Sequence, residues 1–408
     1  MKASWLIAIP LMIGLLAACG GGGGGGGFVP IHSPTATPTP APPAGNVQSM
    51  SVDLGPNGNL VNGAFTSVTV CVPNTANCQT IPNVLLDTGS FGLRLLGSAL
   101  NPTLTLPRQT DGSGDAIAEC GFFGSLFTWG PVATADIEMA DEAASSIPVQ
   151  IISPSGFTTA PTACINSGLP QADSLATLRA NGILGVGVFV QDCGTDCTTN
   201  GSSNPGFYYA CAGSSCSVTT QSEANQVQNP ISSFSGDDNG LIIELPSVPA
   251  GGAKSVTGSL VFGIGTQSNN QLGTAQVFTT DSNGNVTTTF GGNSYGTTYI
   301  DTGSNALFFL STAATGIPEC SGGGFYCPAS SENLSAQIEG QNSATATVDF
   351  TIANANNLFS TNNAVFNDLG GPFSQGFDWG LPFFLGRNVF VAIDGQTTPA
   401  GSGPYFAF

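Results

Sequence analysis

The fold is decided by the stretch Leu85-Leu86-Asp87-Thr88-Gly89-Ser90, which recurs later in the chain as Tyr299-Ile300-Asp301-Thr302-Gly303-Ser304. In both copies apolar residues precede the aspartate, which is typical of a buried strand, and Thr-Gly-Ser then forms the tight turn that ends it. The sequence therefore predicts two carboxylates, each at the end of a core strand and shielded from bulk water.

A second pattern follows each copy in the same order. It is an apolar-apolar-Gly segment, found at Ile183-Leu184-Gly185 in the first half and at Phe384-Leu385-Gly386 in the second, and the flanking residues align without a gap. Self-similarity of this kind indicates a duplicated chain. We expect two similar units, each with one carboxylate turn and one apolar-apolar-Gly strand.

This ordered set of four elements resembles the bilobal pepsin-like aspartic proteases, over about residues 47–408. The resemblance implies an all-β fold in which two similar β-rich lobes flank an active-site cleft. We expect an N-terminal lobe at residues 47–235 and a C-terminal lobe at residues 236–408. The composition agrees, because 56 glycines and only 8% charged residues suit a turn-rich β protein better than a helical one.

The resemblance identifies Asp87 and Asp301 as a catalytic dyad. Two carboxyl groups at hydrogen-bond distance do not both ionise cheaply, an effect best known from the aspartic proteases themselves, so the pair shares a proton and titrates as a unit. A water held between them gives a proton to one oxygen while the other acid protonates the scissile carbonyl. We therefore expect peptide-bond hydrolysis without a covalent enzyme intermediate.

The residues after each aspartate support the dyad, and they are Thr88, Gly89, Ser90, Thr302, Gly303 and Ser304. The two glycines let the backbone approach the carboxylates closely. The two serines can donate hydrogen bonds to the outer carboxylate oxygens. By resemblance, the two threonines bond across to the opposite lobe and fix the distance between the acids.

Residues 111–151 are expected to hold the flap, a β-hairpin that closes over substrate in this family. The best candidate is residues 120–125, so Phe122 and Phe123 are candidates for the flap and the substrate cleft. The family usually has a tyrosine near the flap tip, whereas a phenylalanine supplies the apolar contact without a hydrogen-bond donor. Arg94 stands where most members carry a tryptophan, and it either pairs with a nearby acid or shapes a pocket.

Composition excludes several other classes of function. The single histidine, His32, lies in a Pro/Thr-rich linker, which argues against Ser-His-Asp and Cys-His hydrolases and against histidine-ligated zinc. A net charge of −19 repels nucleic acid and anionic lipid head groups. We expect no cofactor, no metal and no nucleic-acid partner, but a monomer that acts on a peptide or protein substrate.

The N-terminus carries export signals. Residues 1–18 have the features of a signal peptide, and Leu16-Ala17-Ala18-Cys19 matches a bacterial lipobox, so we expect cleavage before Cys19 and lipid attached to it. Residues 19–46 then form a Gly/Pro-rich linker. This indicates an exported lipoprotein of the cell envelope, at the outer membrane or cell surface, held to the membrane by its lipid anchor alone. A plain secretory signal is the alternative.

The ten cysteines after Cys19 fit up to five disulfides in an oxidising compartment. Cys71–Cys78 and Cys320–Cys327 could each close a short loop, and Cys120–Cys164 could join a hairpin to its neighbour. The four cysteines within residues 193–216 leave their pairing open, with a cysteine-rich metal site as the alternative.

These observations predict an aspartic endopeptidase-like lipoprotein. Two alternatives remain open. One is a catalytically weak or inactive pepsin-like surface lipoprotein that binds peptides, which the missing flap tyrosine favours. The other is a structural surface protein, which the low charge and high glycine content favour.

Overall fold

The structure is a computed structural model that describes residues 44–201 and 204–408. Strands dominate this part of the chain and its longest α-helix has five residues, which confirms the predicted all-β class. No helix within the described ranges is long and apolar enough to span a membrane. The signal peptide, Cys19 and most of the linker lie outside the described residues.

The larger sheet has 15 strands within the described residues, and it draws strands from both predicted lobes. In spatial order they are β10 (Ser215–Val218), β9 (Tyr208–Ala212), β5 (Ala116–Phe122), β6 (Phe127–Met139), β7 (Glu142–Ile152), β4 (Phe91–Leu96), β8 (Gly182–Val186), β3 (Cys78–Asp87), β2 (Gly63–Cys71), β1 (Val47–Asp53), β12 (Val256–Phe262), β11 (Gly240–Glu244), β21 (Asn388–Ala392), β24 (Tyr405–Ala407) and β13 (Val277–Thr279).

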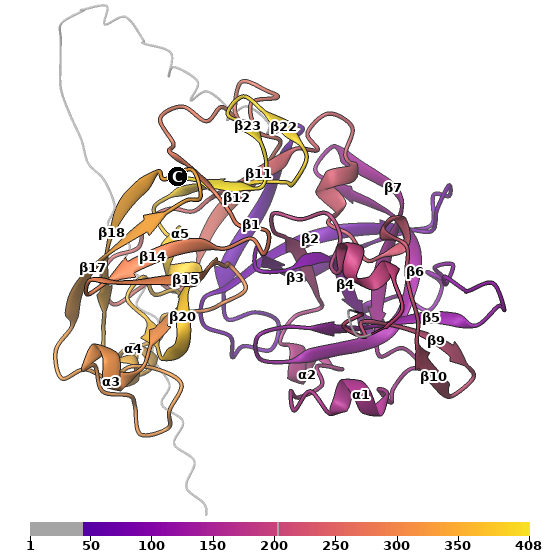
Figure 1. Ribbon diagram of the computed structural model, residues 1–408, viewed down its shortest axis with the longest axis horizontal. Helices are drawn as coiled ribbons and strands as arrows, with labels where there is room; N and C mark the ends of the chain where they lie inside the picture. The colour runs from indigo at the N-terminus through magenta and orange to yellow at the C-terminus, as the bar shows by residue number, and fades with distance from the viewer. Residues whose placement is uncertain (1–43, 202–203) are drawn as a thin grey trace, which may run out of the picture. The chain divides into compact units, whose positions relative to one another are not determined.

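The second sheet has seven strands in the described part of the chain, all from its orange-to-yellow portion in Figure 1. They are β18 (Thr345–Ile352), β17 (Glu332–Glu339), β14 (Val286–Phe290), β15 (Asn293–Ile300), β20 (Phe373–Trp379), β16 (Leu307–Leu310) and β19 (Gly370–Gly371). The remaining described strands are the pair β22 (Thr397–Thr398) and β23 (Gly401–Ser402). The α-helices are short: α1 (Thr162–Ile165), α2 (Leu175–Leu178), α3 (Thr312–Thr315), α4 (Ala355–Phe359) and α5 (Leu381–Phe384). Four 3-10 helices complete the described elements: η1 (Gly97–Ala99), η2 (Gly194–Thr198), η3 (Glu223–Asn225) and η4 (Pro230–Ser233).

Each carboxylate turn lies between strands that pair in the same way in both halves. In the first half, β8 runs parallel to β3, which leads into the turn, and antiparallel to β4, which leaves it. In the second half, β20 runs parallel to β15 and antiparallel to β16. The turn is therefore fixed on both sides by one shared neighbouring strand.

The prediction that Phe384-Leu385-Gly386 is the second apolar-apolar-Gly strand is wrong. Ile300 pairs with Trp379, as Leu86 pairs with Leu184, so the segment equivalent to Ile183-Leu184-Gly185 is Asp378-Trp379-Gly380. Residues 381–384 instead form α5, and the following strand β21 pairs with β11 in the other sheet. The first apolar position of the motif carries an acid in this half, which hides the motif in the sequence.

The lobe boundary at residues 235–236 stays a prediction, because the larger sheet runs through it. β12 pairs with β1 over six residue pairs, and β11 joins β12 to β21. One large buried apolar cluster likewise contains residues of both halves, from Val52 in β1 to Phe377 in β20.

Disulfides join all ten cysteines of the described part. The three predicted pairs, Cys71–Cys78, Cys120–Cys164 and Cys320–Cys327, are confirmed. The open cluster forms Cys193–Cys197 and Cys211–Cys216, so these cysteines do not ligate a metal as thiolates. Cys71 and Cys78 also lie near Glu138 in a grouping of metal-ligand size, but their disulfide removes them as ligands in the same way.

Candidate active site

The two Asp-Thr-Gly-Ser turns meet, and their carboxyl groups lie together. The Gly89 N–H donates to Oδ1 of Asp87 at 2.8 Å and to Oδ1 of Asp301 at 3.2 Å. The Gly303 N–H donates to the same Asp301 oxygen at 2.7 Å. Two acids that are far apart in the sequence thus share one backbone donor.

Both glycines are needed at this distance. A Cβ atom at Gly89 would lie 2.7 Å from Asp301 Cγ, and one at Gly303 would lie 2.6 Å from Asp87 Oδ1. These separations are shorter than real Cβ contacts, so any side chain here would push the carboxyl groups apart. The close approach follows from the missing side chain rather than from an unusual backbone conformation.

Two buried threonines tie the turns to each other in a reciprocal pattern. Thr88 Oγ1 donates to the Ile300 carbonyl at 2.8 Å and accepts from the Thr302 N–H at 3.0 Å. Thr302 Oγ1 donates to the Leu86 carbonyl at 2.9 Å and accepts from the Thr88 N–H at 3.1 Å. Each hydroxyl therefore satisfies backbone groups of the opposite turn, and the four bonds set the spacing of the acids.

The surroundings of Asp87 favour its protonated form. Burial, the negative charge of Asp301 and a hydrogen bond between the two carboxyl groups raise the pKa of Asp87 well above its usual range. Hydrogen bonds from Ser90 and Gly89 act in the opposite direction and offset this only in part. The pair can therefore hold one proton at a pH where separate aspartates are ionised.

One side of the pair reaches solvent. Asp87 is only 6% exposed, whereas Asp301 is partly exposed and Gly89 is exposed. A ligand can therefore approach the two carboxyl groups from the side of Gly89 without unfolding the turns.

The serine of each turn donates to the outer oxygen of its own aspartate. Ser90 Oγ lies 2.5 Å from Asp87 Oδ2, and Ser304 Oγ lies 2.9 Å from Asp301 Oδ2. Ser304 Oγ also lies 2.5 Å from Oδ2 of a third acid, Asp378 in β20. The sequence did not single out Asp378, although an acid between Phe377 and Trp379 is a signal, because a buried carboxyl group needs a partner.

The predicted flap is a β-hairpin, formed by β5 and β6 and closed by a bond from the Phe123 N–H to the Leu126 carbonyl at 2.9 Å. Phe122 packs against Phe127 and Phe207. Phe123 packs against a small apolar cluster and lies 5.4 Å beneath the Arg94 guanidinium. Both rings thus pack against the first half of the chain, and their role in a flap and substrate cleft stays a prediction.

Arg94 pairs with two acids instead of shaping an open pocket. Its Nη2 lies 2.5 Å from Glu119 Oε1 in β5 and 2.9 Å from Asp192 Oδ2, and all three side chains are less than 5% exposed. Tyr208 OH donates to the other oxygen of Asp192 at 2.6 Å. This buried network joins β4, which leaves the first turn, to the first strand of the hairpin.

Charge in this network does not balance, because one guanidinium faces two carboxyl groups. Burial and the charge of Glu119 raise the pKa of Asp192 well above its usual range. Burial and the charge of Asp192 likewise raise the pKa of Tyr208. For Arg94, burial lowers the pKa, but the charges of Glu119 and Asp192 outweigh it, so the pKa is raised and the guanidinium stays charged.

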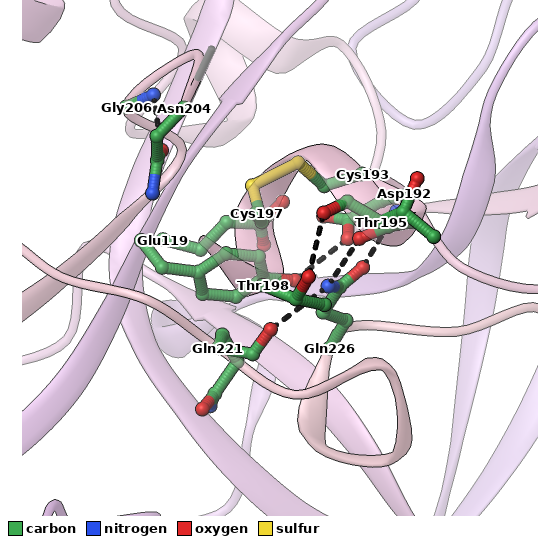
Figure 2. The surroundings of a disulfide bond; sticks show 12 residues. Glu119, Asp192, Cys193, Thr195, Cys197, Thr198, Asn204, Gly206, Gln221 and Gln226 are labelled. Atoms are coloured by element: carbon green, nitrogen blue, oxygen red, sulfur yellow. Dashed lines mark hydrogen bonds between the residues drawn. A yellow bond between two sulfur atoms is a disulfide. The ribbon is translucent and has the colours of Figure 1, made fainter. Parts of the chain in front are cut away.

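Three members of this network were missed in the sequence, because they lie far apart and form no local pattern. The usable signal was Arg94 and Glu119, each a charge within an otherwise apolar strand. Asp192 directly precedes, and Tyr208 lies within, the segment 193–216 whose cysteine pairing the sequence left open. Figure 2 shows Asp192 beside the Cys193–Cys197 disulfide, where the Gln226 amide accepts from the Gly194 N–H at 2.7 Å and donates to its carbonyl at 2.8 Å.

Comparison with known proteins identifies a family and a solved structure with a similar fold. A search of curated proteins found no match to this chain. The crystal structure of an aspartic proteinase from Irpex lacteus is similar with a TM-score of 0.48 and 16% identity, covering 88% of this chain and 96% of that chain. A likeness at this level carries no argument about activity, which must come from the site itself. Residues 42–408 match the model of a family described as "Protein of unknown function (DUF3443)", so the chain belongs to that family.

Proposed function

We propose that this chain is an aspartic-type endopeptidase in which Asp87 and Asp301 act together on one water molecule. The proposal is carried by one observation, the shared Gly89 N–H that donates to Oδ1 of both carboxyl groups. Carboxyl groups held this closely, with solvent access on one side, suit an acid–base pair better than two separate structural turns.

The geometry supports direct attack by water. The ionised carboxylate of the pair takes a proton from water, while the protonated carboxyl group gives its proton to the carbonyl oxygen of the scissile bond. A C–O bond forms in this step as the carbonyl π bond breaks. The C–N bond then breaks as the amine nitrogen takes up the proton that the carboxylate received from water, and the diol hydroxyl returns its proton to the pair as the carbonyl re-forms. The raised pKa of Asp87 keeps the necessary proton in the pair under mildly acidic conditions.

The expected substrate is an extended peptide, since a peptide in this conformation can add to a sheet edge through its main chain. The β5–β6 hairpin, anchored through Glu119 to Arg94, is our candidate for one wall of its binding site. We further propose that the protein works outside the cytoplasm as a lipid-anchored monomer, on the basis of residues 1–19 and the ten paired cysteines.

A second candidate is a peptide-binding lipoprotein with little or no turnover. It is favoured by the residue type at this place in the hairpin, because neither Phe122 nor Phe123 brings a hydroxyl donor to a bound peptide. The two candidates differ in whether peptides are cut or only bound.

Digestion of a peptide library from pH 3 to 7, read by mass spectrometry, tests the proposal. Wild type should cut at acidic pH, and Asp301→Asn should not cut. The matched control is Asp349→Asn, which changes an exposed carboxylate in β18 and should cut like wild type. Binding without cleavage products would support the second candidate, and cleavage by Asp301→Asn would contradict the dyad.

A further inference from the structure

Ser304 stands between two carboxyl groups that cannot both accept its proton. Its Oγ lies 2.9 Å from Asp301 Oδ2 and 2.5 Å from Asp378 Oδ2. A serine hydroxyl has one hydrogen to donate and lone pairs to accept with. If both carboxyl groups were ionised, one of these contacts would join two acceptors, so one carboxyl group must supply the missing hydrogen.

The environment of Asp378 identifies it as the donor. Its second oxygen, Oδ1, is buried and has no hydrogen-bond partner among the described residues. An ionised carboxylate would leave charge on that unpaired oxygen, whereas a protonated group leaves only a neutral carbonyl oxygen there, which costs less to bury. Asp301, in contrast, already accepts from the backbone of Gly89 and Gly303 and so is suited to the ionised form.

Among the described residues, no cation forms an ion pair with Asp378. The groups that face it are Asp301 through Ser304, Asp87 beyond it, its cross-strand neighbour Tyr299 in β15, and Phe308 in β16. The ion pairs formed within residues 44–201 and 204–408 both belong to Arg94. Burial and the charge of Asp301 raise the pKa of Asp378 well above its usual range, and the bond to Ser304 offsets this only in part.

We propose that Asp378 holds a proton in the native protein and donates it to Ser304 Oγ, which then donates to Asp301 Oδ2. The proposal rests on the proposed function in that the chain Asp378–Ser304–Asp301 positions one acid of the dyad. Asp378 is thus a positioning residue that acts through Ser304. It fixes the direction of the Ser304 hydroxyl, and ionisation of Asp378 lets that hydroxyl turn away from Asp301.

The first half has no such chain. The residue equivalent to Asp378 is Ile183, which pairs with Leu85 as Asp378 pairs with Tyr299. Ser90 therefore donates to Asp87 without a second acid behind it. The effect of Asp378 should enter the dyad from the side of Asp301 only.

The test replaces Asp378 by asparagine, whose amide has the shape of the protonated acid and can donate to Ser304 at every pH. We expect the alkaline limb of kcat/KM, measured on one cleaved peptide, to move up by about one pH unit in Asp378→Asn. Asp349→Asn, the exposed control, should leave the limb in place. A limb that stays or moves down in Asp378→Asn would overturn the proposal, because an ionised Asp378 would then be compatible with activity.

A second measurement does not need activity and separates this proposal from the proposed function. A folded-state pKa above the unfolded value gives stability that is complete below about pH 4 and is lost as pH rises through the folded pKa. Urea unfolding should therefore show wild type losing stability relative to Asp378→Asn as pH rises from about 4 to 7. Identical pH dependence would overturn the proposal even if peptides are cut.

If no peptide is cut by any variant, the proposed function fails while the unfolding curves still decide where the proton lies. If Asp378→Asn does not fold, Asp378→Ile, which carries the residue of the first half, takes its place. Isoleucine has no ionisable side chain either, so wild type should again lose stability relative to Asp378→Ile as pH rises.

Discussion

The two carboxylate turns share their threonine bonds and their strand pairing but differ in the charged side chains behind them. In the first half, Arg94 in β4 lies across from Ile183. At the matching place in the second half, Phe308 in β16 lies across from Asp378. Of this cross-strand pair, the first half thus makes the β4 member a cation and the second half makes the β20 member an acid. The backbone pairing of β3, β8 and β4 is nevertheless reproduced by β15, β20 and β16.

This difference shows which parts of the duplicated unit are constrained. The glycines and threonines bond directly across the two turns, so each half must keep them. The strand positions behind the turns contact only their own half, and there the two halves diverge. Their divergence gives the two aspartates different surroundings, which an acid–base pair with distinct roles requires.

Arg94→Leu should produce the largest change in stability of this comparison. It leaves Glu119 and Asp192 buried without their cation, so the free energy of unfolding should fall by about 4 kcal/mol. Phe308→Leu, at the equivalent position, only trims an apolar side chain and should cost about 1 kcal/mol. Urea unfolding at pH 7 measures both losses. Equal losses would show that the Arg94 network contributes no more to the free energy of unfolding than the packing of Phe308 does.

Gly89→Ala and Gly303→Ala should impair activity equally, because each added Cβ atom presses on the aspartate of the opposite turn. Displacing a carboxyl group by a fraction of an ångström should lower kcat/KM by about 100-fold. Gly112→Ala is the matched control, since its Cβ atom would meet nothing within 4 Å. An unimpaired Gly89 or Gly303 variant would mean that the close approach is not needed.

Thr88→Val and Thr302→Val should each lower the free energy of unfolding by about 2 kcal/mol, because each leaves a buried carbonyl and a buried N–H of the opposite turn unpaired. Thermal unfolding of the two variants side by side measures this symmetry. A loss confined to one of them would show that the reciprocal bonds do not contribute equally.

Substitutions of the two serines should have the smallest effects on activity, but they distinguish the two halves most clearly. Ser90→Ala and Ser304→Ala each remove one hydrogen bond to the dyad and should lower kcat/KM by about tenfold. Only Ser304 links the dyad to Asp378, so Ser304→Ala should abolish the pH shift caused by Asp378→Asn, and Ser90→Ala should preserve it. The double variants decide this, and a shift that survives without Ser304 would refute the linkage.

Much of this arrangement was predictable from local patterns. The repeated Asp-Thr-Gly-Ser stretch contains its own turn and its own supporting residues, and three of the disulfides were among the pairings that the sequence allowed. The features that the sequence analysis did not predict depend on contacts between residues that are far apart in the chain. Because Asp378 is an acid, Asp378-Trp379-Gly380 does not match the apolar-apolar-Gly pattern. The sequence therefore indicated Phe384-Leu385-Gly386, which matches the pattern but lies outside the sheet that holds the second turn. The Arg94 network was hidden because its acids come from β5 and from the segment after β8.

The most direct test of the paired carboxyl groups is a carbon-13 NMR titration of protein labelled at the aspartate side-chain carboxyl carbon. Asp87, assigned by its loss in Asp87→Asn, should stay protonated well above its usual pKa in wild type, and Asp301→Asn should bring its pKa down, because the neighbouring charge is gone. An Asp87 that titrates in its usual range, or whose titration ignores Asp301→Asn, would contradict the account.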